Sequence, residues 1–227
     1  YHTAQAWNVW GEPNYGFSNG RIAVRDGVQM VIDLNGKTID RRMPRSQGGS
    51  EGSVIFLYTD KQLDIIDSSY TEDIKNQVQT IYDTHKANKD NLVSALKDLP
   101  VGKITGGWGN GAGGCINMMN TSTLKLHGGI LMNNQNATGG AINIYQNTTL
   151  HMYNGIIAGN STPDIGGGVC VRPGGTANIY NGIITNNEAL AGGGIYGEGT
   201  LYAGDTIVSA SYINFYNGII SYNHATC

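Results

Sequence analysis

The sequence predicts an all-β fold, a parallel β-helix solenoid into which an α-helical hairpin is inserted. First, a phrase of two or three glycines followed by apolar residues starts at positions 113, 139, 166 and 192, at intervals of 26 or 27 residues. Second, the apolar residues between these phrases alternate, as Leu124 and Leu126 do, which is the period of a strand with one buried face. Third, residues 68–101 interrupt this pattern with apolar residues at helical spacing. Short strands within a fixed period of this size are typical of a solenoid.

A second phrase supports the same period. Tyr-Asn-Gly-Ile starts at positions 153, 180 and 216, and His-Gly-Gly-Ile stands in its place at 127. The last interval is 36 residues long, so it carries roughly nine extra residues, which we expect to loop out within 199–212.

The chain of 227 residues is long enough for one solenoid domain with a continuous core. Residues 1–20 contain several aromatic side chains and are expected to form an N-terminal cap or edge. We expect the first coils in 21–67, the helical insert in 68–101 and the regular coils in 102–227. The chain starts at Tyr1 and stops directly after a repeat phrase, which favours a fragment of a longer protein.

The insert has the pattern of two helices. Ser69 and Glu72 form a predicted capping box at the start of the first helix, and Asn88 marks the break before the second. Such a hairpin either covers the flank or an open end of the solenoid, or projects as a recognition element. In the second case its candidate ligand contacts are Ile74, Val78, Tyr82, Lys86 and Lys89.

Stacking of the coils aligns equivalent residues into columns. One column contains Asn134, Asn160, Asn187 and Asn223, and we expect these side chains to bond their neighbours above and below, which stabilises the fold. An outward column contains His127, Tyr153, Tyr180 and Tyr216, next to Lys125, His151, Asn178 and Asn214. These rings either only stack between strands, or form a ligand-binding face made of Tyr153, Tyr180, Tyr216 and His151.

The phrases GGAI, GGGV and YNGIITNN, together with VIDLNGKTID at 31–40, resemble the right-handed parallel β-helix repeats of bacterial surface proteins. They are similar to repeats of polymorphic outer-membrane proteins and adhesin-like proteins in the pectin-lyase-like superfamily. The resemblance implies a right-handed coil and an extracellular or bacterial cell-surface location. It also implies a non-enzymatic, adhesin-like module that recognises a host glycoprotein, for which a mucin or immunoglobulin is conceivable, or a glycan. A polysaccharide-active lyase or hydrolase and a passive surface stalk are the alternatives on the same fold.

An enzyme of this fold needs converging carboxylates and a basic residue. Asp33, Asp40 and Arg41 form the one cluster that offers weak catalytic candidates, although Asp33 is more typical of a side chain that caps a turn. We therefore favour a protein that is not an enzyme. The three cysteines lack metal-ligand spacing, so we expect neither a metal nor another cofactor.

The composition limits the partners. A formal charge of −3 gives no footprint for nucleic acid, and no apolar run is long enough to span a membrane. Only six of the 31 charged side chains lie in residues 111–227, so the repeat surface is polar but nearly uncharged. We expect a monomer.

Overall fold

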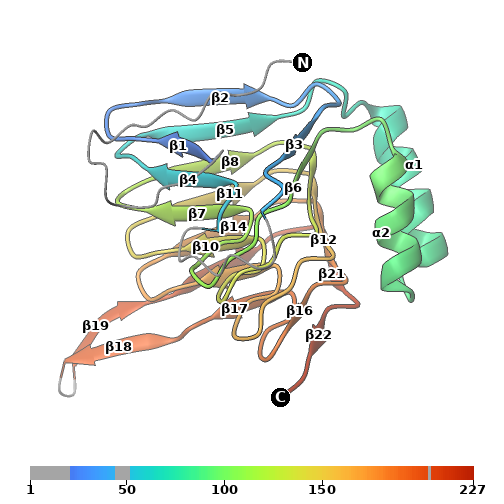
Figure 1. The fold of residues 1–227 in the computed structure, drawn as a ribbon. Coiled ribbons are helices and arrows are strands. Elements are labelled where there is room, and N and C mark those ends of the chain that lie inside the picture. Colours follow the sequence, from blue (N-terminus) through green and yellow to red (C-terminus); the bar gives the residue numbers. More distant parts are fainter. Residues whose placement is uncertain (1–20, 44–51, 204–205) are drawn as a thin grey trace.

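The computed structural model describes residues 21–43, 52–203 and 206–227. The segment 1–20, predicted as a cap or edge, lies outside the described residues. The described chain winds through three parallel sheets, each made of one strand from every coil, and carries two helices along one flank (Figure 1). This is a parallel β-helix with a helical insert, as the repeat period predicts.

Each sheet contains six strands, which follow one another along the stack in the order of the sequence. The first sheet contains β1 (Ile22–Val24), β4 (Ile55–Tyr58), β7 (Ile116–Met119), β10 (Ile142–Ile144), β13 (Val169–Val171) and β17 (Ile195–Gly197). The second contains β2 (Met30–Asp33), β5 (Gln62–Ile66), β8 (Thr123–Leu126), β11 (Thr149–Met152), β14 (Thr176–Ile179) and β20 (Tyr212–Phe215). The third contains β3 (Thr38–Asp40), β6 (Lys103–Thr105), β9 (Ile130–Met132), β12 (Ile156–Ala158), β15 (Ile183–Thr185) and β21 (Ile219–Ser221). A further short pair joins β16 (Glu188–Ala189) to β22 (His224–Ala225).

The strands pair in the register that the sequence period sets. Leu150 of β11, for example, pairs with Leu124 on one side and Ala177 on the other. All three side chains point into the solenoid and are fully buried. The interior is therefore a continuous apolar stack in which each coil covers the core of the next.

The asparagine column forms the predicted ladder. The Oδ1 atom of Asn160 accepts hydrogen bonds from the backbone and side-chain nitrogens of Asn134, both at 3.0 Å. Asn187 Oδ1 does the same for Asn160, at 3.0 and 2.9 Å, and Asn223 Oδ1 for Asn187, at 3.0 Å each. The ladder satisfies buried backbone groups at the corner that follows the third sheet.

Glycine is required where the chain turns from the second sheet into the third. Gly155, Gly182 and Gly218 all have φ near +100° to +115° (103°, 114° and 113°). A Cβ at Gly182 would lie 2.7 Å from the carbonyl oxygen of Gly155, and one at Gly218 would lie 2.6 Å from that of Gly182. The coils approach so closely here that only a residue without a side chain fits.

The insert consists of α1 (Glu72–His85) and α2 (Lys89–Asp98), and its break at Asn88 is confirmed because Asn88 caps α2. The predicted capping box at Ser69 is wrong. Thr71 is the N-cap of α1, and its hydroxyl accepts from Ile74 N at 3.4 Å, whereas Ser69 Oγ donates to Asp67 Oδ1 at 2.7 Å. Ser69 and Thr71 both have side chains that can cap a helix. Asp67 accepts a hydrogen bond from the Ser69 hydroxyl, and Thr71 caps α1.

The hairpin packs against the outer face of the third sheet (Figure 1). The apolar faces of both helices and the outward side chains of β9, β12 and β15 form a second buried cluster, separate from the solenoid interior. It contains Ile74, Val78, Tyr82, Leu92, Leu96, Leu99, Val101, Ile130, Met132, Ile156, Ala158 and Ile183. The structure thus places the insert as a cover over the flank. No described helix is long and apolar enough to cross a membrane.

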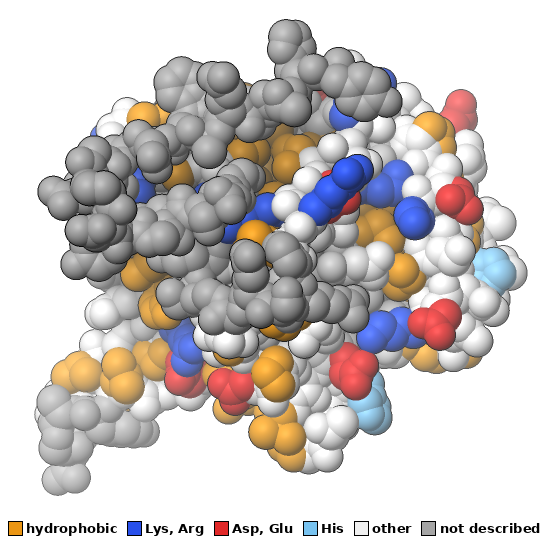
Figure 2. Space-filling view, in the orientation of Figure 1, with side chains coloured by type: hydrophobic (Ala, Val, Ile, Leu, Met, Phe, Trp, Pro, Cys, Tyr) orange, Lys and Arg blue, Asp and Glu red, His pale blue; other side chains and the backbone are white. Residues whose placement is uncertain are grey.

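The extra residues of the last interval loop out, as predicted, and form an antiparallel hairpin of β18 (Thr200–Ala203) and β19 (Thr206–Ala210). This hairpin projects from the solenoid at the lower left of Figure 1. Leu201, Ile207 and Val208 are exposed on it, and Figure 2 shows the hydrophobic side chains that it presents.

Candidate functional site

The outward aromatic column forms a stack of rings, which we call the ring ladder: His127, Tyr153, Tyr180 and Tyr216. Each residue directly follows a strand of the second sheet, so the parallel register brings the rings into line. Neighbouring ring centroids are 4.9 Å apart throughout, and the rings are inclined by 19° at the histidine and 8° between the tyrosines. The stacking predicted for this column is therefore confirmed.

His151 lies beside the ring ladder, in the outward column of the second sheet. Its ring stacks at 5.9 Å from that of Tyr180, and its Nδ1 lies 3.3 Å from the Tyr180 hydroxyl. Burial and, to a smaller extent, the charge of Lys125 lower the pKa of His151. The pKa of Tyr180 is raised by desolvation and by its two tyrosine neighbours in the ladder. His151 and Tyr180 are therefore both favoured in their neutral forms at neutral pH.

The ring ladder is accessible at its surface. Tyr153 is 38% exposed and Tyr216 is 64% exposed. Within the described part of the chain, the hydroxyls of these two tyrosines have no hydrogen-bond partner. At the other end, His127 Nε2 lies 3.2 Å from Asp64 Oδ1. The ladder thus offers a row of phenol groups whose rings are held in place. The Tyr180 hydroxyl contacts His151, whereas the hydroxyls of Tyr153 and Tyr216 are free among the described residues.

A groove of about 140 Å³, which we call the ladder groove, runs beside the ring ladder. The side chains of Lys75 and Gln79 on α1 line one wall, and Asn154 and Asn181, which directly follow two ladder tyrosines, line the other. Its lining includes Gly182, which belongs to a column where neighbouring coils approach too closely for a side chain. The absence of side chains in that column keeps the groove open.

The asparagines of the ladder groove present hydrogen-bond donors. Asn154 Oδ1 accepts from Gly155 N and Asn181 Oδ1 accepts from Gly182 N, both at 2.9 Å. These bonds fix the orientation of each amide. Neither Nδ2 group has a partner among the described residues, so two donors remain available to a ligand.

The residues predicted as contacts on the helical hairpin fall into two groups. Ile74, Val78 and Tyr82 are 8%, 2% and 6% exposed, and Tyr82 also joins its hydroxyl to Ser221 Oγ at 2.5 Å. These three side chains hold the hairpin on the third sheet, and only Val78 reaches the wall of the ladder groove.

The two lysines at the loop between the helices are at the surface. Lys86 Nζ lies 3.4 Å from Asp83 Oδ1 and 5.5 Å from the centre of the Tyr82 ring. Lys89 Nζ pairs with Glu188 Oε2 at 3.1 Å, across from the helix to the solenoid. Because both pairs are exposed, they contribute little to stability.

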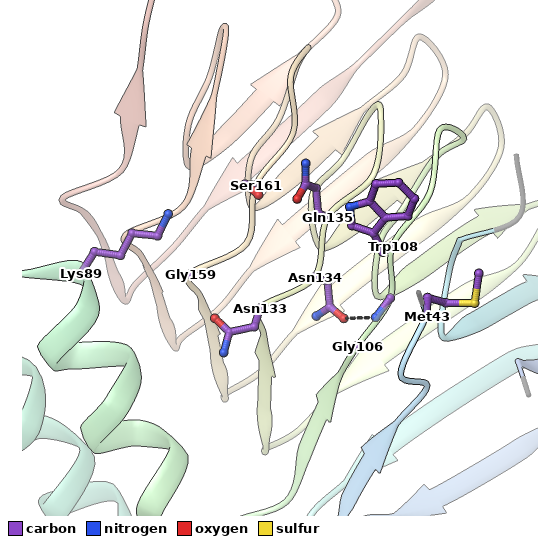
Figure 3. A pocket seen from close by; sticks show the side chains of 10 residues that line it. Met43, Lys89, Gly106, Trp108, Asn133, Asn134, Gln135, Gly159 and Ser161 are labelled. Carbon is purple, nitrogen blue, oxygen red and sulfur yellow. Dashed lines mark hydrogen bonds between the residues drawn. The ribbon is translucent and has the colours of Figure 1, made fainter. Parts of the chain in front are cut away.

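The structure contains a larger groove that sequence reasoning missed, shown in Figure 3. This corner groove has a volume of about 480 Å³ and lies where the chain leaves the third sheet, beside the start of α2. Trp108, Gln135 and Ser161 line it and form a column of parallel backbone bridges. Gln135 and Ser161 directly follow the ladder residues Asn134 and Asn160, and Trp108 follows Gly107, which occupies the equivalent position in its coil. The column next to the asparagine ladder in the sequence therefore identifies all three residues.

Asp33 and Asp40 use their carboxylates to fix turns. Asp33 Oδ1 accepts from Asn35 N at 3.0 Å and Ser68 N at 2.9 Å, and the backbone hydrogen bond from Ser68 is the main cause of the lowered pKa of Asp33. Asp40 Oδ1 accepts from Arg42 N at 3.0 Å. These oxygens are occupied as turn acceptors, which is the role that the sequence favoured for Asp33.

Arg41 is equally engaged. It donates through Nη1 to the carbonyl oxygen of Ser53, and burial lowers its pKa to about 10. In the described ranges, no group of three or more His, Cys, Asp or Glu side chains is arranged to hold a metal ion. Cys115 and Cys170 are buried and unpaired, and burial raises the pKa of Cys170 to about 12.

Comparison with known proteins gives no relative: no family model, no curated protein and no solved structure matches the chain.

Proposed function

We propose that this chain is a non-enzymatic, adhesin-like binding module of a bacterial surface or secreted protein. Its ligand is a host glycoprotein or a glycan, bound along the ring ladder and in the ladder groove. One observation carries the proposal: two of the stacked, accessible tyrosines are each followed in the sequence by an asparagine that lines a groove, and these asparagines have unpaired amide donors among the described residues. The resemblance of the repeats to those of pectin-lyase-like surface proteins supports the location.

The ring ladder is organised before any ligand arrives. A tyrosine held between two parallel rings has little rotamer freedom left to lose on binding. Rigid aromatic side chains therefore provide contact area at low entropic cost, as they do in other protein recognition surfaces. The ring faces are covered by their neighbours, so the ladder offers mainly hydroxyls and ring edges, with one more open ring at Tyr216.

The chemistry of this surface fits a ligand rich in hydroxyl or amide groups. Residues 111–227 carry only six charged side chains, and Lys75 of the ladder groove pairs with Glu72 Oε2 at 2.8 Å, so binding depends on hydrogen bonds and shape more than on ionic attraction. The spacing of 4.9 Å between rings repeats the same contact from coil to coil. A repeating surface suits an extended ligand, such as a glycan chain or a glycosylated peptide lying along the stack.

The experiment pairs a glycan array with capture from mucosal secretions, using the intact protein and point variants. Tyr216→Ala removes an exposed ring of the ladder, and Tyr212→Ala, on the same coil and 57% exposed, is the matched control outside the ladder. Tyr180→Ala removes a central ring. We expect both ladder variants to weaken binding by about tenfold or more, which is the effect of a hot-spot aromatic, and the control to bind normally.

Three outcomes would overturn the proposal. Equal binding by the ladder variants and the control would place the ligand elsewhere. Turnover of a polysaccharide that is lost in Asp40→Ala would favour the enzymatic alternative. The absence of any ligand on the array and in secretions would favour a passive stalk.

A further inference from the structure

The corner groove lies on the other side of the helical hairpin from the ring ladder. The ladder groove is walled by α1 at the corner between the second and third sheets, whereas the corner groove lies beside the first residue of α2, after the third sheet. Its volume of about 480 Å³ is within the range of small-molecule sites, roughly 300–1,000 Å³. The two grooves are therefore separate, and each can be altered without the other.

Trp108 is held in the corner groove by its backbone. Its N–H donates to the carbonyl oxygen of Gly52 at 3.1 Å, and the preceding Gly107 N donates to Asn134 Oδ1 at 3.1 Å. The next coil is attached in the same way, since Gln135 N donates to Gly107 O at 2.9 Å. Figure 3 shows Trp108 and Gln135 on these successive turns. The backbone that carries the indole is thus fixed on the corner between successive coils.

Several polar side chains that line the corner groove make no hydrogen bond to the described part of the chain. Among the described residues, no hydrogen-bond partner exists for the indole Nε1 of Trp108 or for the side chains of Asn133, Gln135 and Ser161. Asn134, which stands between two of them in sequence, makes hydrogen bonds through both its oxygen and its nitrogen. One set of amides thus builds the ladder, while the neighbouring set faces a hollow with its donors and acceptors free.

The bottom of the groove is kept open by a glycine. Gly159 has φ +66°, and a Cβ there would lie 2.6 Å from Val93 Cγ2 of α2 and 3.1 Å from Asn133 Oδ1. A larger residue would push α2 away from the solenoid or displace the Asn133 amide. The hairpin and the corner therefore meet at a position where only glycine fits.

The groove is electrically balanced. Lys89 is the only ionisable residue that lines it among those described, and its ammonium group pairs with Glu188 at 3.1 Å. Figure 3 shows the Lys89 side chain extending from α2 toward Ser161 along the edge of the hollow. An anion would have to compete with the Glu188 carboxylate for this one cation. The lining favours a ligand without charge.

We propose that the corner groove is a second binding site and takes a neutral sugar residue, with the sugar ring against Trp108. The apolar C–H face of a sugar fits the indole surface, and its hydroxyls both donate and accept hydrogen bonds. Gln135 and Asn133 amides, the Ser161 hydroxyl and the indole N–H supply the complementary groups. This combination of one aromatic surface with a few convergent polar groups is what small-ligand sites use to fix orientation. The site does not depend on the ring ladder.

The test titrates defined oligosaccharides into the intact chain. The probes are neutral trisaccharides of glucose, galactose, mannose or N-acetylglucosamine, with trigalacturonate as the charged counterpart. Binding is followed by calorimetry and by the indole N–H resonances of 15N-labelled protein. The chain has three tryptophans, so Trp108→Phe assigns the resonance of Trp108. We expect at least one neutral trisaccharide to shift this resonance.

Variants separate the corner groove from the ring ladder. Trp108→Ala is expected to weaken binding of the neutral trisaccharide about tenfold or more, and Gln135→Ala by several-fold. Gln135→Ala serves as the second variant because its side chain makes no hydrogen bond within the described chain, so its loss leaves the fold intact. Tyr180→Ala is the matched control and should leave this binding unchanged even if it abolishes binding along the ladder.

Three results would contradict the proposed sugar site in the corner groove. Tighter binding of trigalacturonate than of every neutral probe would refute the assignment of a neutral ligand. Affinity unchanged in both Trp108→Ala and Gln135→Ala would place the sugar outside the groove. The idea also fails if no neutral probe binds more tightly than about 10 mM, since so weak an interaction is not a specific site.

Discussion

The asparagine ladder gives the sharpest prediction about stability, and Asn160→Ala is the change that tests it. The Asn160 side chain is fully buried and makes five hydrogen bonds. Its Nδ2 donates to Leu131 O at 3.0 Å, Ala158 O at 3.2 Å and Asn187 Oδ1 at 2.9 Å. Its Oδ1 accepts from the backbone and side-chain nitrogens of Asn134 at 3.0 Å each.

The cost follows from the groups left behind. After the substitution the buried backbone N–H of Asn134 has no acceptor, and an orphaned buried donor costs about 1–3 kcal/mol. The lost bonds from Nδ2 add about 0.5–1.5 kcal/mol each when they are replaced only in part by water or rearrangement. We therefore expect the free energy of unfolding to fall by about 3 kcal/mol or more. A loss of this size is typical of a substitution that breaks a buried hydrogen-bond network.

Urea unfolding followed by circular dichroism measures this loss, with hydrogen exchange at the Asn134 amide as a local readout. Asn214→Ala is the matched control, because Asn214 is exposed and its side chain makes one hydrogen bond, from Nδ2 to Asn178 Oδ1 at 2.8 Å. The control should lose about 1 kcal/mol or less. If Asn160→Ala is no less stable than Asn214→Ala, the ladder does not hold the coils together and the reasoning is wrong.

Three further outcomes are expected. In the native protein only Cys227 should react with a thiol reagent, because the other two thiols are buried and the pKa of Cys170 is raised to about 12; reaction of more than one thiol without denaturant contradicts this. The NMR titration of His151 should have its midpoint below 6.5. The neutral His151 ring therefore contributes stability that is present above pH 6.5 and is lost as the pH falls through the pKa of the folded state. Lys125→Gln should move this midpoint upward, and no movement would exclude the charge of Lys125 as a cause of the lowered pKa. Leu96→Ala, at a 1% exposed position of α2, should cost about 2–5 kcal/mol in thermal or urea unfolding, and a loss below 1 kcal/mol would mean that the hairpin is loosely attached.

The asparagine and aromatic columns could be predicted from the sequence because the repeat period alone determines which residues become neighbours in successive coils. In a stack of nearly identical coils, residues 26 or 27 positions apart become direct neighbours, so a column in the sequence becomes a contact in space. Asn134 and Asn160 hydrogen-bond for this reason, and the rings of Tyr153 and Tyr180 stack for the same reason. The position of the extra hairpin in the last coil follows equally from the change in interval.

The corner groove could not be predicted in this way. Its far wall comes from α2, and the path of an insert over a solenoid is decided by long-range packing that the repeat period does not encode. The start of α1 was also ambiguous, because Ser69 and Thr71 both have side chains that cap helices. The carboxylate of Asp67 holds Ser69 and leaves Thr71 to cap the helix, which is a tertiary and not a local effect.

The covering role of the hairpin, in contrast, could have been predicted from the strands of the third sheet, in which apolar and polar residues do not alternate. The strands of the third sheet are apolar at every position in Ile130–Met132 and Ile156–Ala158, which is typical of strands that are buried on both faces. Leu131 and Ile157 face the solenoid interior, while their neighbours face the helices. A solenoid strand without alternation therefore predicts a cover on its outer side.

Because the hairpin covers the third sheet, the two proposed binding sites should not be tested by deleting it. Deletion of residues 70–99 would expose the outward side chains of β9, β12 and β15 together, and a contiguous apolar face of that kind causes association in solution. It would also remove the α1 wall of the ladder groove and the α2 wall of the corner groove at once. Loss of binding in such a protein would not identify the hairpin as the recognition element. Substitutions confined to one groove, such as Gln79→Ala beside the ring ladder and Gln135→Ala at the corner, leave the cover in place and separate the two sites.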